Sequence, residues 1–152
     1  MSLQKEDITH RPLRVRVRLD FKGIGKPGRF LFGGKPGDKA AEDLREQQVA
    51  VFRNVPIQGI QVEEIDMSSE VYVVQDEVTN SEAAYAPVIL ELRAETLEDV
   101  IRFIARDDFR KIEIIEPVNL ALTKYDVERL LFRVAEEMRV YRSLLERKFN
   151  HR

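Results

Sequence analysis

Residues 13–21, LRVRVRLDF, alternate apolar and polar side chains without a break. Because successive side chains of a β-strand point to opposite faces, this alternation predicts a strand with one face on a core and the other in solvent. The five apolar residues would face the core: Leu13, Val15, Val17, Leu19 and Phe21. The outer face would carry Arg14, Arg16 and Arg18. Such a strand fits a sheet that is covered on one side only.

Residues 39–53 predict a first helix, with Asp38 as its N-cap and Leu44 on its apolar side. The apolar run 49–52 could instead extend as strand. The other predicted strands are 57–67, in which Gly59 is a candidate bulge, 71–74, 87–94, in which Pro87 holds the first position, and 110–116, which Pro117 ends.

The same capping pattern occurs twice in the second half of the chain. Thr96 precedes a run of apolar residues at helical spacing, and Asp99 lies three positions on, which predicts a short helix. Thr123 and Asp126 repeat the pattern and begin a long helix over 124–148. Both helices therefore have a defined first residue.

The predicted order is β-α-β(β)-β-α-β-α. Its core is the split arrangement of ferredoxin-like domains, in the α+β class: an antiparallel sheet with helices on one face, here with an additional long C-terminal helix. A chain of 152 residues suits one hydrophobic core. We therefore expect a single domain over residues 12–152, preceded by a mobile N-terminal arm at 1–11.

Residues 21–39 hold six of the seven glycines, the tetrapeptide GKPG twice, and one match to G-x-G-x-x-G. No helix is predicted directly after the match, although a dinucleotide site needs helix N-terminal amides at that point. A P-loop is also disfavoured, because Pro36 stands where a magnesium-binding hydroxyl belongs. We predict two proline-set turns that form a basic flap over 22–37. A backbone anion nest assisted by Lys26 and Lys35 is the alternative.

Basic residues are concentrated in the same region. Residues 11–39 contain nine basic and two acidic residues, a net charge of +7, although the whole chain has a net charge of −2. Alternate arginines on a strand lie about 6.6 Å apart, close to the phosphate spacing of an extended single strand. The candidate anion-binding or nucleic-acid-binding residues are Arg14, Arg16, Arg18, Lys22, Lys26, Arg29 and Lys35. In the alternative interpretation, the strand arginines are solvated or pair across the sheet with Glu63, Glu91 or Glu113.

Few residues are placed for catalysis. The two histidines, His10 and His151, lie near the chain ends, where a general base is poorly held. The absence of cysteine excludes thiolate nucleophiles and zinc-thiolate sites, and it suits a reducing cytoplasm. An enzyme built on the carboxylates of 63–66 or of Asp107-Asp108 is the least favoured hypothesis. We expect no metal, no cofactor, no membrane partner and a cytoplasmic location.

The last helix has the apolar spacing of a short coiled coil. Its seam follows a 4-3-4-3-4 pattern through Val127, Leu131, Val134, Met138, Tyr141 and Leu145. At ~1.5 Å per residue the helix would be about 35 Å long, more than a compact sheet can cover. We therefore expect its first half to pack on its own domain and its second half to meet another copy of the chain. A lone surface helix with a broader core face is the alternative.

Residues 88–141 resemble the C-terminal WCX domain that follows the WYL domain in many bacterial transcription regulators. The shared pattern is an alternating strand, a short helix of the LEDVIRFI kind, a strand that ends in Glu116-Pro117, and a final helix that closes on Tyr141. The resemblance implies a ferredoxin-like fold and a role in oligomerisation or in the response to an effector.

These observations favour a non-enzymatic, self-associating module with a regulatory or scaffolding role and an anionic effector as a candidate ligand. The alternative is a nucleic-acid-binding protein that uses the basic strand and the flap.

Overall fold

The computed structural model of the chain describes residues 12–23, 36–78 and 80–150. The predicted N-terminal arm at 1–11 and most of the predicted flap, including Lys26, Arg29 and Lys35, lie outside these residues.

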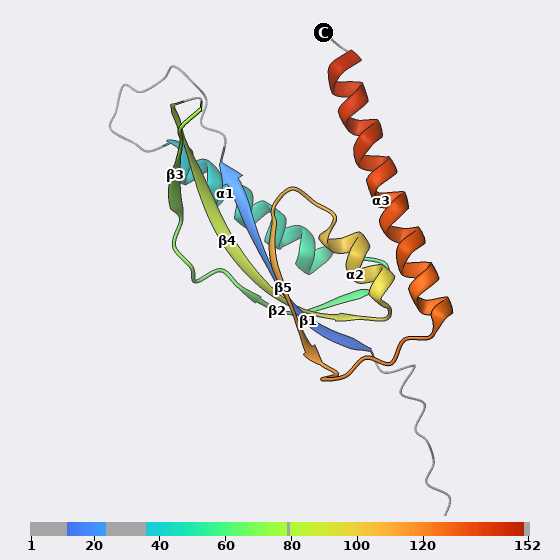
Figure 1. The fold of residues 1–152 in the computed structure, drawn as a ribbon. Coiled ribbons are helices and arrows are strands. Elements are labelled where there is room, and N and C mark those ends of the chain that lie inside the picture. The colour runs from blue at the N-terminus through green and yellow to red at the C-terminus, as the bar shows by residue number, and fades with distance from the viewer. Residues whose placement is uncertain (1–11, 24–35, 79, 151–152) are drawn as a thin grey trace, which may run out of the picture.

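The described residues form an α+β fold in which one antiparallel sheet is accompanied by three helices (Figure 1). In chain order the elements are β1 (Leu13–Gly23), α1 (Pro36–Asn54), β2 (Ile60–Asp66), β3 (Tyr72–Asp76), β4 (Ser81–Ala94), α2 (Leu97–Ile104), β5 (Phe109–Glu116) and α3 (Lys124–Asn150). The strand order is β2-β4-β1-β5, and β3 also pairs with β4. This is the ferredoxin-like order with one edge strand divided into β2 and β3, so the predicted fold class is confirmed.

The core lies between the sheet and the first two helices. All five apolar residues of β1 are buried, as its alternation predicts, and Val17 pairs with the buried Leu90 of β4. The rings of Phe52 from α1 and Phe103 from α2 lie 6.0 Å apart, which places both helices on the same face of the sheet. The opposite face of the sheet carries the arginines of β1 and their carboxylate partners.

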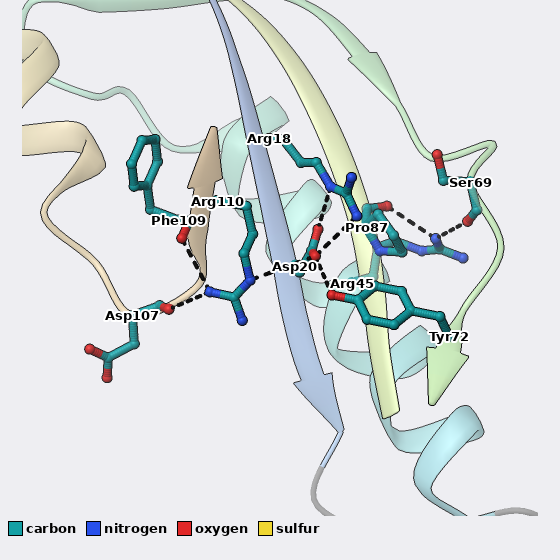
Figure 2. A network of polar contacts seen from close by, with 9 residues as sticks. All are labelled: Arg18, Asp20, Arg45, Ser69, Tyr72, Pro87, Asp107, Phe109 and Arg110. Carbon is teal, nitrogen blue, oxygen red and sulfur yellow. Dashed lines mark hydrogen bonds and ion pairs between the residues drawn. The ribbon is translucent and has the colours of Figure 1, made fainter. Parts of the chain in front are cut away.

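Pro87 lies inside β4 and not at its first position, so this prediction was wrong. β2 pairs with residues 89–94 and β3 with residues 81–85, so the edge strand is interrupted beside Pro87. A residue without an N–H is tolerated there, because neither β2 nor β3 pairs with it and its only strand neighbour is Asp20 of β1, on the other side. The guanidinium of Arg45 fills the gap by donating to the carbonyl oxygens of Pro87, at 3.1 Å, and Ser69, at 2.8 Å (Figure 2).

Gly59 lies in the turn before β2 and is not a bulge. Its φ of 72° is in the left-handed region, and a Cβ there would lie 2.2 Å from the carboxylate of Asp99. The irregular pairing of β2 falls instead between Val62 and Glu64. Glycine is therefore required at position 59 both by the turn and by the close approach of α2.

The helix boundaries agree with the capping patterns in two of three cases. The hydroxyl of Thr96 accepts from the backbone N–H of Asp99, and that of Thr123 accepts from the N–H of Asp126, each at 3.2 Å. α1 is the exception, because it begins at Pro36 and places Asp38 in its first turn. The helix continues to Asn54, so the alternative that residues 49–52 extend as strand is wrong.

We expect Gly23→Ala to destabilise the fold by about 1–3 kcal/mol, because added atoms in a packed contact force the backbone to move. A Cβ at Gly23 would lie 2.3 Å from the carbonyl oxygen of Gly37 and 2.4 Å from the backbone nitrogen of Ala41, where β1 ends against α1. Gly37→Ala is the matched control, because its Cβ would meet only the Cβ of Ala84, at 3.6 Å. Urea denaturation measures both variants, and an equal loss in the two would contradict the packing argument.

Candidate functional site

The open face of the sheet carries a ladder of ion pairs that crosses four strands. Arg14 binds Glu91 of β4 at 3.1 Å and Glu63 of β2 at 3.5 Å. Arg16 binds Glu91 at 2.9 Å and Glu113 of β5 at 3.2 Å. The cross-strand pairing considered as an alternative to nucleic-acid binding is therefore present, with all three of the proposed glutamates.

The ladder shifts the ionisation of its members. The hydrogen bond from Arg16, together with that from Arg14, holds the pKa of Glu91 below its usual value of 4.5. The hydrogen bond from Lys111, with a further contribution from Arg16, lowers the pKa of Glu113. In return, the bond to Glu91 raises the pKa of Arg16. Arg16, Glu91 and Glu113 are thus all held in their charged forms.

Glu91→Gln should make stability less dependent on pH. Because the pKa of Glu91 is lower in the folded chain than its usual 4.5, its ion pairs contribute stability above that pH and lose it as the pH falls through the folded value. We expect the variant to be less stable than the parent at pH 7 and to lose less stability between about pH 5 and pH 2. Urea denaturation over this range measures the difference.

Glu46→Gln, at an exposed position of α1, is the matched control and should leave the pH dependence as it is. If the stabilities of Glu91→Gln and Glu46→Gln depend on pH in the same way, the ion pairs of Glu91 do not contribute to stability.

A second polar cluster surrounds Asp20, whose side chain is 2% exposed although it lies on the open face of the sheet (Figure 2). Its carboxylate accepts from Nε of Arg18 at 2.8 Å, accepts from the hydroxyl of Tyr72, and lies 3.7 Å from Nε of Arg110. The stacked rings of Tyr72 and Tyr85, with centroids 5.4 Å apart, cover this corner of the sheet. Burial and the bond to Asp20 raise the pKa of Tyr72.

The Asp20 cluster was not predicted from the sequence, because its members are far apart in the chain. One signal was available: Asp20 is the only acidic residue among the polar positions of a strand otherwise filled with arginine and lysine. The partners of Asp20 provide hydrogen bonds and ion pairs to its buried carboxylate, as a buried charge requires. We therefore interpret it as structural.

Tyr72→Phe should cost about 1.5–3 kcal/mol, the usual range for a hydrogen bond to a charged group. Tyr85→Phe keeps the same ring pair and is the matched control, with an expected change within about 0.5 kcal/mol. Thermal and urea denaturation compare the two. Equal effects would show that the bond from Tyr72 to Asp20 makes no specific contribution to stability.

Three of the five carboxylates considered for catalysis have structural partners. Glu63 binds Arg93 at 2.8 Å, Asp108 binds Arg106 at 2.5 Å, and Asp66 accepts from the hydroxyl of Ser68 at 2.5 Å. The bonds from Ser68 lower the pKa of Asp66, whereas a general acid needs a raised pKa. Within the described part of the chain, no three or more histidine, cysteine, aspartate or glutamate residues are arranged to hold a metal ion.

The described structure contains four of the seven candidate anion-binding residues, and all four lie on β1. Arg14, Arg16 and Arg18 form one stripe on β1, and each has a carboxylate partner. Lys22 is exposed on the same strand, opposite Tyr85. The other three, Lys26, Arg29 and Lys35, lie outside the described residues.

α3 presents many exposed apolar side chains. None of its 27 residues is buried. The six seam residues all lie exposed, with exposed fractions between 38% for Leu145 and 67% for Met138. Within the described residues, no helix is long and apolar enough to cross a membrane. The seam predicted from spacing is therefore present on the helix surface and uncovered.

α3 is positioned by α2 and not by the sheet (Figure 1). Nε of Arg129 lies 3.3 Å from the carboxylate of Glu98 near the N-terminal ends of the two helices. Beyond this contact the helices enclose an open groove of about 1260 Å³. Its apolar walls are Ile101 and Ile104 from α2 and Met138, Tyr141, Leu144 and Leu145 from α3. The C-terminal half of the seam is thus one wall of a groove that nothing in the described chain fills.

No protein-family model, curated protein or solved structure matches this chain. The likeness of residues 88–141 to WCX domains stays a prediction.

Proposed function

We propose that this chain is a non-enzymatic, self-associating module with a regulatory or scaffolding role, and that α3 forms the interface between copies. One observation carries the proposal: a 27-residue helix with a coiled-coil seam buries none of its own residues. A role in oligomerisation is also what the resemblance to WCX domains suggests. A reducing cytoplasm suits a module that contains no cysteine.

Covering the seam is favourable because it removes large apolar side chains from water. Each large apolar side chain gains about 1.5–3 kcal/mol when it moves from water to a packed interior. The first two helices already occupy the covered face of the sheet, and none of the described residues covers the seam. Contiguous exposed apolar patches on soluble proteins usually mark interaction sites. Covering Leu131, Met138 and Tyr141 therefore requires a partner.

A second copy of the chain is the partner that the seam fits. Heptad seams pack against other heptad seams, because each a or d side chain enters a hole formed by four residues of the facing helix. From Val127 to Leu145 the seam is about 27 Å long at ~1.5 Å per residue. An identical helix supplies a matching seam of the same length and period. Closed two-fold pairs are also the commonest assemblies of soluble proteins.

The ion pairs on β1 weaken the nucleic-acid alternative. Binding to phosphates gains free energy when lysine and arginine displace counterions from the nucleic acid. Arg14 and Arg16 would first have to leave Glu91, which holds both of them. The strand is thus better suited to joining neighbouring strands than to binding a polyanion.

Met138→Glu should convert the self-associated protein into monomers, because a carboxylate in the centre of the seam would be buried without a partner. Ser143→Glu is the matched control: it adds the same charge to an exposed position of the same helix, away from the seam. Size-exclusion chromatography with light scattering measures the mass of each variant, and circular dichroism checks that helix content is kept.

We expect the parent protein and Ser143→Glu to keep the same mass, at least that of a dimer, and Met138→Glu to have the monomer mass. A parent protein that is monomeric up to high micromolar concentrations would refute the proposal. An associated state unaffected by Met138→Glu would refute the assignment of the interface to α3.

A further inference from the structure

We infer that two copies pair their α3 helices antiparallel, in a register centred on Glu136, so that each copy covers the projecting C-terminal half of the other's helix. This inference rests on the proposed self-association and adds its geometry. It follows from the seam positions, from the distribution of charge along α3 and from the groove between α2 and α3.

The heptad spacing defines one antiparallel register. With Leu131, Met138 and Leu145 at a positions, the d positions are Val127, Val134 and Tyr141. In an antiparallel pair, a residues face d residues. Centring on Glu136 aligns all six seam positions at once: Val127 of one copy faces Leu145 of the other, Leu131 faces Tyr141, and Val134 faces Met138.

These antiparallel layers match small side chains with large ones. Both valines face a longer residue, and the large Tyr141 faces Leu131, so the three kinds of layer have similar volumes. A parallel pair would instead place each residue opposite itself. It would have two narrow layers, at Val127 and Val134, and one wide layer of two tyrosines, whose hydroxyls would meet in the core. Even filling of the interface favours the antiparallel pair, because voids and overpacking both cost stability.

The charge of α3 differs between its halves. Residues 124–136 contain three basic and three acidic residues, whereas 137–150 contain four basic and two acidic residues, a net charge of +2. A parallel pair would place the two positive halves side by side. The antiparallel pair places each positive half along the neutral half of the other copy, where Glu98 of α2 also lies. Ion pairs beside the seam do not separate the two arrangements, since Arg142 could face Glu128 or Glu137.

The projecting half of α3 provides the third argument. Figure 1 shows the C-terminal half of α3 continuing past the end of α2, away from the sheet. An antiparallel partner would lay the first half of its α3, with its own α2, along this projecting half and against the groove lined by Ile104, Tyr141 and Leu145. A parallel partner would leave both projecting halves beyond both domains, covered only by each other.

Disulfide trapping distinguishes the two orientations, and the chain contains no cysteine that would interfere. The variants are Val127→Cys and Leu145→Cys, each purified alone and then mixed in equal amounts before mild oxidation. In the antiparallel pair the two copies of position 145 are separated by about 27 Å, too far for a disulfide, which needs Cβ atoms roughly 4 Å apart. Position 127 of one copy, however, faces position 145 of the other.

We expect a covalent dimer from the mixture and little or none from either variant alone, on non-reducing gels and by mass spectrometry. Ser143→Cys, on the opposite side of the helix, reports random collisions and should stay monomeric on the gel. Efficient cross-linking of Leu145→Cys with itself would overturn the antiparallel register while supporting self-association. Failure of every combination, with a monomeric mass in light scattering, would overturn both proposals.

Discussion

The pairing of β1 with β4 sets the constraint on which the rest of the structure depends. In this register Val17 faces Leu90 and Leu19 faces Val88, so every buried side chain of one strand lies beside a buried side chain of the other. One face of the two central strands is thereby wholly apolar and must be covered, which α1 and α2 do. The same register sends Arg14 and Arg16 to the other face. Their charges are satisfied only because neighbouring strands present glutamates at the same level of the sheet.

The position of α3 is a consequence of this arrangement. Two helices fill the covered face of a small antiparallel sheet, and the ion-pair ladder occupies the other face. The last helix therefore packs on the edge of α2, which is anchored in the core by Val100 and Phe103. Within the described residues, the apolar seam of a helix so placed stays exposed. The feature that we interpret as functional thus arises because α1 and α2 already occupy the apolar face of the sheet.

Patterns among neighbouring residues predicted the helices and strands, whereas contacts between residues far apart in the chain determine the surroundings of Pro87 and Asp20. Strand alternation and the two threonine caps are properties of neighbouring residues, so they could be read from the sequence. Pro87 was misplaced because the gap that tolerates it is created by β2 and β3, which are paired elsewhere along β4. Asp20 was missed because Tyr72 and Arg110 reach it from other strands. The spacing of the seam was visible in the sequence, whereas its exposure depends on how the other helices fill the sheet.

The ion-pair ladder and the seam of α3 differ in the free energy that association would gain by covering them. Covering the ladder would remove water from carboxylates that already have partners, and the cost of desolvating ion pairs commonly cancels the gain from burying them. Covering the seam removes only apolar surface from water. The seam is therefore the surface on which we expect association to be favourable, and in the described part of the chain it is joined to the sheet through the eight-residue α2 and the segment after β5. Any ligand that regulates association from the sheet would have to act through one of these two connections.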